Sequence, residues 1–213
     1  MFAVLDANGK PTGATKRRAD IHRDGDWHGA LHIWVGGVEA AGRSFALFQR
    51  RSASKDTWPG SVDVAVGGHL RAGESLAETV REAEEEIGLV LTLADLTHLG
   101  RRFAHSAGGT DNEVQEVFGV RSDLALDRYR LHPDEVTAVI SVGLDDAIAL
   151  FEGVVETVPA LELRRDPAST VPAAIAVGVN DFAAGEVGGY AVRALRGLRA
   201  VVAGGAPEPF ELR

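Results

Sequence analysis

Short apolar runs separated by turn-forming residues recur along most of this chain. Runs of this length, bounded by glycine, proline and polar residues, are typical of strands. The predicted strands are Phe2 to Leu5, Ala30 to Val38, Phe45 to Gln49, Val62 to Val66, Thr97 to Phe103, Val114 to Val120 and Val136 to Val142. So many strands predict a mixed sheet as the central layer, with helices packed against it.

The segment that ends at Gly88 has a different pattern, because its apolar residues follow helical spacing. Ser75 followed three residues later by Glu78 is a capping box, and Gly88 stands where helices commonly end. We therefore expect a helix over residues 74–87. Its inward-facing residues are Leu76, Thr79, Val80, Ala83 and Ile87.

Two further helices are predicted, over Leu144–Phe151 and Ala191–Ala203. From about Gly153 the composition shifts toward alanine, valine, glycine and proline, so residues 153–213 are predicted to be a C-terminal extension packed on a single domain, 1–213. The apolar stripe of the last helix is typical of packing in a core or against a second copy of the chain. A homodimer is therefore one expectation.

Composition narrows the class of protein. With 213 residues, 45% of them hydrophobic, the chain is long enough to bury a core. It has no cysteine, which excludes disulfides, thiolate nucleophiles and cysteine-bound metals. No apolar run approaches the roughly 20 residues that span a bilayer. The N-terminus also lacks an export signal, so we expect a cytoplasmic protein without membrane contact.

The charge of the chain is acidic and locally concentrated. It has 22 Lys+Arg against 31 Asp+Glu, a net charge of −9, which argues against binding to a nucleic acid polymer. Glu82, Glu85 and Glu86 fall on one face of the predicted helix, where like charges repel one another. A solvated acidic face would explain them. A hard divalent cation, Mg²⁺ or Mn²⁺, would compensate the repulsion.

The glycines and acids around this helix form a longer pattern. Gly68, five residues and Glu74 are followed, after six more residues, by Arg81-Glu82-Ala83-Glu84-Glu85-Glu86-Ile87-Gly88-Leu89. Here the chain resembles the Nudix box, although the family has seven residues in the second spacer. The resemblance implies an α/β (α+β) fold, the Nudix-type α/β/α sandwich with a mixed β-sheet. It also implies metal-dependent hydrolysis of a small-molecule diphosphate substrate.

The same resemblance implies roles for individual residues. The metal ligands would be Glu82, Glu85 and Glu86, with Arg81 orienting one of these carboxylates. The candidates for the general base are Glu86, Glu113, Glu116 and Glu135. Glu113 and Glu116 are three residues apart on a predicted strand, so only one of them can face the metals. The family likeness favours Glu113.

A second resemblance, from about Val4 to Leu150, is to the type 1 isopentenyl-diphosphate isomerases and related Nudix hydrolases. It is carried by runs such as Trp58-Pro59-Gly60 and Asp111-Asn112-Glu113-Val114. The second metal site that it implies consists of His22, His28, His69, Asp111 and Glu113. Imidazole and carboxylate together suit Mn²⁺, Zn²⁺ or Fe²⁺. The alternative for residues 21–28 is a polar loop with incidental histidines, and His32 is expected to be structural.

The second resemblance also implies that Arg18, Arg51 and Lys55 hold the substrate diphosphate, whereas surface solubility is the alternative. The isomerases use a cysteine immediately before the Gly-His pair, where this chain has Gly67. Because that proton donor is missing, we expect a pyrophosphohydrolase that cleaves a diphosphate linkage in a small organic or nucleoside diphosphate derivative. The alternatives are a catalytically weak binding or regulatory domain and an isomerase-like enzyme.

Overall fold

A computed structural model describes residues 1–105, 111–165, 171–183 and 188–213. Its strands are β1 (Phe2–Leu5), β2 (Pro11–Lys16), β3 (Trp27–Val38), β4 (Ser44–Arg51), β5 (Val62–Val64), β6 (Val66–His69), β7 (Thr97–His105), β8 (Asn112–Arg121), β9 (Val136–Gly143), β10 (Thr157–Arg164), β11 (Ala173–Gly178) and β12 (Phe210–Leu212). Its α-helices are α1 (Arg18–Asp24), α2 (Leu76–Thr79), α3 (Glu82–Ile87), α4 (Leu144–Phe151) and α5 (Gly189–Val202).

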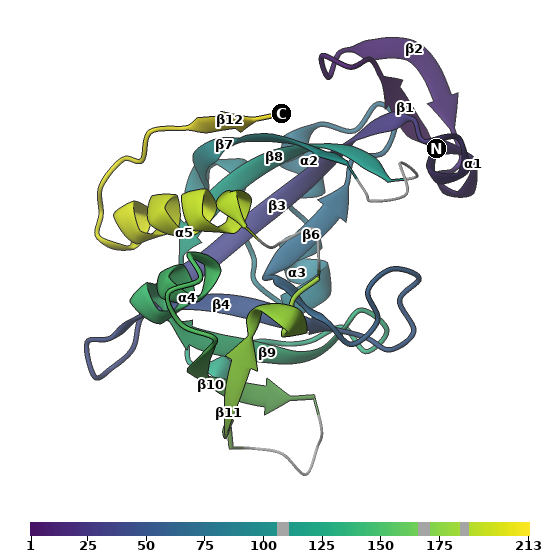
Figure 1. Ribbon diagram of the computed structural model, residues 1–213. Coiled ribbons are helices and arrows are strands. Elements are labelled where there is room, and N and C mark those ends of the chain that lie inside the picture. The colour runs from purple at the N-terminus through teal and green to yellow at the C-terminus, as the bar shows by residue number, and fades with distance from the viewer. Residues whose placement is uncertain (106–110, 166–170, 184–187) are drawn as a thin grey trace.

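The described strands form one mixed sheet, with the main order β11-β10-β9-β4-β3-β8-β7-β12 (Figure 1). The pairs β3–β8 and β7–β12 are parallel, and the other pairs are antiparallel. Along one side, β3 pairs with β6 through residues 30–33 and then with β4 through residues 35–38. Two strands, β6 and β4, therefore share this side of β3.

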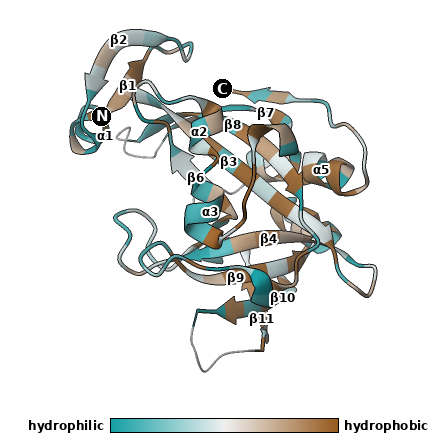
Figure 2. Cartoon of the chain, turned by 180° about the vertical axis from the view of Figure 1, so that it is seen from behind, coloured by the Kyte–Doolittle hydropathy of each residue, from teal (hydrophilic) through white to brown (hydrophobic). Residues whose placement is uncertain are grey.

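Helices cover both faces of the sheet, and a hydrophobic cluster lies on each face. On one face, α4 and α5 pack with Trp34 and Phe48 of the sheet. On the other face, Val80 and residues of α3 pack with Leu31 and Ile33. Figure 2 shows α3 as mostly hydrophilic on its outer side, next to the hydrophobic strands behind it. This mixed sheet with few helices confirms the predicted fold class. None of the described helices is long and apolar enough to cross a bilayer.

Several elements were not predicted from the sequence. Residues 18–24 form α1 rather than a polar loop, and β2 precedes it. The segment after residue 153 does not only pack on the sheet, because β10 pairs with β9 and β11 pairs with β10. Pro159 and Pro172 made this segment look irregular, but Pro159 lies within β10, opposite Ala176 of β11. The C-terminal residues therefore widen the sheet.

The predicted helix over residues 74–87 consists of two short helices. Ser75 and Glu78 form the expected capping box at the start of α2, and Gly88 ends α3 with a φ of 71°. Between them, Arg81 N donates to Glu78 O and Ala83 N donates to Val80 O, so these bonds span three residues instead of four. The tighter turn lies in the spacer that is one residue shorter than the Nudix pattern.

Candidate active site

Three histidines and two acids from distant parts of the chain meet on one face of β3 and β6. His22, His28, His69 and Asp111 each offer a ligand atom, and these atoms lie within 4.8 Å of one another. Asp111 Oδ1 is 3.5 Å from His22 Nε2 and 3.6 Å from His28 Nε2. Glu113 Oε1 lies 2.8 Å from His69 Nε2 and 3.9 Å from His28 Nε2. We call these five residues the histidine centre.

Strand register brings the histidine centre together. The parallel pairing of β3 with β8 places His28 opposite Glu113, and the rings of His28 and His69 stack with centroids 5.2 Å apart. The Asn112 side-chain amide donates to Gly25 O over 2.8 Å, which fastens the end of α1 to β8. The centre therefore depends on contacts between α1, β3, β6 and β8 that no short stretch of sequence contains.

The buried imidazoles of the centre are suited to bind a cation. Nε2 of His22 and of His28 is buried and makes no hydrogen bond within the part of the chain that the structure describes. Burial lowers the pKa of both imidazoles, which favours the neutral form that binds metals. His28 Nδ1 lies 3.2 Å from Asp26 O, an orientation that leaves Nε2 as the ligand atom.

Glu113 is the ionised acid of the centre. Burial by itself raises the pKa of this carboxyl, but the contact with His69 lowers the pKa by more, so that the net pKa lies below its ordinary value. The Gln115 side-chain amide also donates to Glu113 Oε2 over 2.7 Å. Glu116 points to the other side of β8, where it pairs with His98 and Arg101. Of the two acids, Glu113 is therefore the one beside the candidate metal ligands.

The carboxylates of the Nudix-like helix have a different arrangement. Arg81 makes ion pairs with Glu74, with Glu82 over 2.9 Å and with Glu85 over 3.3 Å. Glu85 is exposed, whereas burial raises the pKa of Glu82. Among the described residues, Glu82, Glu85 and Glu86 do not gather around one point as the histidine centre does. Arg81 thus contacts these carboxylates, and its role in orienting a metal ligand stays a prediction.

Glu86 lies inside the fold, next to β6. Its Oε2 accepts hydrogen bonds from Gln49 Nε2 over 3.1 Å and from Gly67 N over 3.4 Å. Burial raises the pKa of Glu86 to about 8, and the nearby Lys55 opposes this rise. A carboxyl in such a position is a candidate for a ligand or a general base, because a cation or a substrate would change its protonation.

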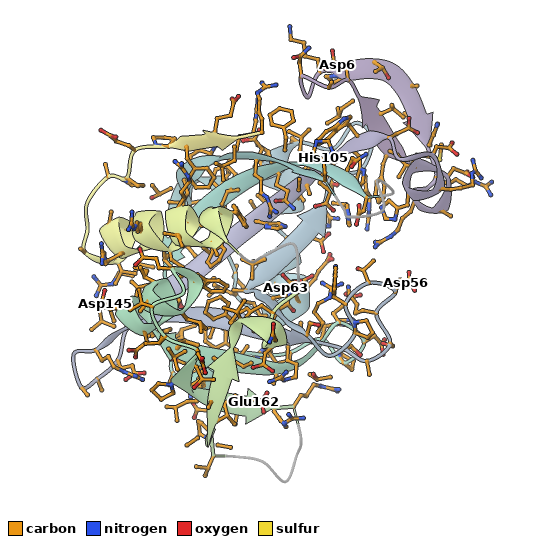
Figure 3. All side chains as sticks on the ribbon, viewed as in Figure 1. Asp6, Asp56, Asp63, His105, Asp145 and Glu162 are labelled. Carbon is orange, nitrogen blue, oxygen red and sulfur yellow. The ribbon has the colours of Figure 1, made fainter. Side chains whose placement is uncertain are left out.

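The three predicted diphosphate-binding residues lie around one pocket. Arg18, Arg51 and Lys55 line a cavity of about 310 Å³. Lys55 makes an ion pair with Glu135, and Arg51 Nη1 lies 2.8 Å from Asp63 Oδ2. Figure 3 shows Asp63 near the centre of the molecule, to the left of the loop that carries Asp56. The pocket therefore combines cations with acids that a bound anion would displace.

Sequence reasoning assigned no role to Gln49, Asp63 or Gln115, although each contacts a predicted site residue. Gln115 lies two residues after Glu113 on β8, and this spacing places both side chains on one face of a strand. That alternation is the pattern that would have identified Gln115. The partners of Gln49 and Asp63 are distant in sequence, so no pattern marks them.

Comparison with known proteins agrees with this fold. Residues 16–162 match the NUDIX domain family. An uncharacterised Nudix hydrolase of Clostridium acetobutylicum is 30% identical over 146 residues, which cover 67% of this chain and 70% of the relative. An isopentenyl-diphosphate Δ-isomerase of Escherichia coli is 35% identical over 136 residues, which cover 62% of this chain and 71% of the isomerase.

Solved structures show the same fold. The DR0079 protein of Deinococcus radiodurans has a TM-score of 0.53 and 21% sequence identity, over 71% of this chain and 88% of that chain. The chain therefore belongs to the Nudix family. Its relatives include proteins named as Nudix hydrolases, which supports a hydrolase that acts on phosphoanhydride-type substrates.

Proposed function

We propose that the protein is a metal-dependent pyrophosphohydrolase that cleaves a diphosphate linkage in a small organic or nucleoside diphosphate derivative. The observation that carries this proposal is the histidine centre, in which buried imidazole nitrogens without hydrogen bonds face carboxylates in the described structure. Such a cluster is costly to bury unless it binds a cation. Arg18, Arg51 and Lys55 in the lining of the pocket offer cations to an anionic substrate, beside the acids Asp56, Asp134 and Glu135.

Two sets of residues fit divalent cations. The neutral imidazoles and carboxylates of the histidine centre suit Mn²⁺, and the all-oxygen set of Glu82, Glu85 and Glu86 suits Mg²⁺ or Mn²⁺. A bound cation would supply charge neutralisation at the phosphate oxygens and lower the pKa of water. Arg81, which already contacts Glu82 and Glu85, would orient these carboxylates.

The other steps belong to residues of the chain. Arg18, Arg51 and Lys55 would bind the diphosphate, and Arg51 and Lys55 would exchange their present acidic partners for it. Glu113 is ionised, which suits a ligand, and it stays a candidate for the base although its lowered pKa makes it a weak one. Glu86 is the second candidate for the base, because it is buried beside Gly67 N.

A phosphate-release screen with Mg²⁺ or Mn²⁺ tests the proposal, over nucleoside diphosphate derivatives, sugar nucleotides and prenyl diphosphates. We expect turnover of at least one compound, and a loss of kcat of about 100-fold or more in Glu113→Gln and Glu86→Gln. Glu116→Gln is the matched control, because Glu116 faces the other side of β8. Absence of turnover with every compound would contradict the hydrolase proposal. Conversion of a prenyl diphosphate without phosphate release would identify an isomerase.

A binding or regulatory domain is the second candidate, and one observation favours it. The shortened spacer leaves Arg81 in contact with Glu74, Glu82 and Glu85 together, so a cation must compete with a guanidinium for two of these carboxylates. Such a domain would bind a diphosphate compound in calorimetry and release no phosphate from it.

A homodimer stays a prediction, which light scattering at several protein concentrations checks.

A further inference from the structure

A glutamine of β4 lies buried where this strand passes from the core to the substrate pocket. Gln49 is 3% exposed. Two residues before it, Leu47 packs in the hydrophobic cluster that contains residues of α3, and two residues after it, Arg51 lines the pocket. Alternate residues of a strand share a face, so Gln49 lies on the α3 side of the sheet. A buried amide has lost its contacts with water, so it needs partners in the protein.

The partner of this amide is Glu86, one of the three predicted metal ligands of α3. Gln49 Nε2 lies 3.1 Å from Glu86 Oε2, and the backbone N–H of Gly67 donates to the same oxygen over 3.4 Å. Within the part of the chain that the structure describes, no hydrogen bond reaches the other oxygen, Oε1. Two strands, β4 and β6, thus hold one oxygen of the carboxylate and leave the second one available.

The chemistry of the carboxylate decides which end of the Gln49 amide faces it. A carboxylate that binds a cation is ionised, so its oxygens only accept hydrogen bonds. The amide oxygen of Gln49 would repel such a group, whereas the amide N–H donates to it. The N–H of Gly67 is a donor in any case. Hydrogen bonds to an ionised acceptor are stronger than those between neutral groups, so both donors fix Oε2 most firmly when the carboxylate is charged.

Glu86 differs from the other two carboxylates of its set in the kind of group that contacts it. Arg81 makes ion pairs with Glu82 and with Glu85. Among the described residues, no basic side chain makes an ion pair with Glu86, whose side-chain contacts are the neutral donors of Gln49 and of the backbone. A neutral donor orients a carboxylate without cancelling its charge. Glu86 therefore keeps the full negative charge that attracts a divalent cation.

We propose that Gln49 is a positioning residue for Glu86: its amide, together with the N–H of Gly67, holds Oε2 and leaves Oε1 to bind a divalent cation. This inference rests on the proposed function, because it concerns a ligand of one of the two proposed cation sites. Gln49 lies on β4, outside the Nudix pattern of residues 68–89. The sheet, and not only the helix that carries the glutamates, would therefore set the affinity for the cation.

The test measures Mn²⁺ binding to the full chain without substrate. The parent protein carries His28→Leu, which removes a ligand of the histidine centre and leaves the carboxylates of α3 as the Mn²⁺ site. Gln49→Met, added to this parent, removes the amide and keeps the length of the side chain. We expect an affinity for Mn²⁺ lower by about 10-fold or more, as is usual when the partner of a metal ligand is removed. Electron paramagnetic resonance of the free aqueous Mn²⁺ follows the titration.

Two controls separate positioning from a purely structural role. In buffer with a chelator, Gln49→Met should lower the Tm by no more than about 4 °C, the effect of one lost hydrogen bond. Ser141→Ala is the matched variant, because Ser141 is buried on β9 opposite Leu47 and its hydroxyl has no partner among the described residues. It should bind Mn²⁺ within about twofold of the parent. Gln49→Leu also lacks the amide, so it replaces Gln49→Met if that variant fails to fold.

The outcomes distinguish this inference from the function on which it rests. The role of Gln49 would be overturned, while hydrolysis remains, if Gln49→Met bound Mn²⁺ as tightly as its parent or if Ser141→Ala lost as much affinity. A parent that binds no Mn²⁺, or a much larger fall in the metal-free Tm of Gln49→Met, would also overturn it. A wild-type protein that neither binds Mn²⁺ nor releases phosphate from any compound would overturn the proposed function, and the role of Gln49 with it.

Discussion

The side chain of His28 is fully buried, yet its Nε2 has no hydrogen-bond partner in the described structure. A buried polar atom without a partner costs about 1–3 kcal/mol. Its Nδ1 faces the Asp26 carbonyl, so rotation of the ring would only exchange one unsatisfied atom for another. Local stability is thus lowered at the position where the candidate metal ligands meet, as is common at functional sites.

This cost leads to a prediction for His28→Leu. In metal-free buffer with a chelator, the variant should be as stable as the wild type or more stable by about 1 kcal/mol, because it removes the unpaired nitrogen. Addition of Mn²⁺ should raise the Tm of the wild type by more than the Tm of the variant, which keeps only the carboxylate set on α3. Urea unfolding and thermal melts measure both effects. A variant whose Tm rises with Mn²⁺ by as much as that of the wild type would contradict a metal site at the histidines.

At the residue scale, sequence reasoning named His22, His28, His69, Asp111 and Glu113, and the structure brings these side chains together. Whether they bind metal stays a prediction. The sequence predicted a structural role for His32 but did not identify its partner. Its partner Tyr190 is 158 residues away, and no local pattern connects a strand histidine with a helix tyrosine at that separation.

At the scale of elements, most predicted strands lie within a few residues of the observed ones, because alternation and turn residues are local properties. The helix over residues 74–87 was expected in one piece, and the capping box at Ser75 and the end at Gly88 are confirmed. The tighter turn at Val80 was not predicted. A missing spacer residue shows that the helix must differ from the family pattern, but not how the backbone takes up the change.

Gly88 provides a prediction about how α3 ends. Its φ of 71° is left-handed, and an added Cβ would meet the Cβ of Arg130 at 2.7 Å. Gly153, with a φ of 72° and nothing within 4 Å of an added Cβ, is a matched control. We expect Gly153→Ala to lower the free energy of unfolding by about 1–2 kcal/mol through backbone strain alone. Gly88→Ala should lower the free energy of unfolding by more, because the added Cβ also meets Arg130. Urea unfolding measures both variants, and equal losses of free energy in the two would contradict a steric role for Arg130.

For the whole molecule, residues 153–213 supply an outer layer of the structure and both ends of the main sheet order. β10 pairs with β9, and Leu195 and Leu198 of α5 are fully buried. Arg50 of β4 also pairs over 2.6 Å with Glu162, which is 4% exposed. The sequence predicted only an extension packed on the domain, because its prolines interrupt the apolar pattern that would identify β10 and β11 as strands.

A truncation measures how far the chain depends on this layer. A chain ending at Glu152 should lose cooperative unfolding in urea, because β9 loses a partner strand and the cluster under α5 is exposed. Removal of residues 206–213 alone, which takes away β12, should leave a folded protein with a lower Tm. Far-UV circular dichroism distinguishes the two cases. Cooperative unfolding of the 1–152 chain would show that the last third is dispensable for folding.

The two neighbouring glycines of β6 give the scaffold unequal freedom to diversify. An added Cβ at Gly68 would meet Glu82 Cγ at 2.6 Å, whereas one at Gly67 would meet only ordinary contacts of 3.8 Å or more. Gly67→Ala should therefore fold normally while it fills the space beside His32. The fold can therefore accept other side chains at position 67 far more readily than at position 68.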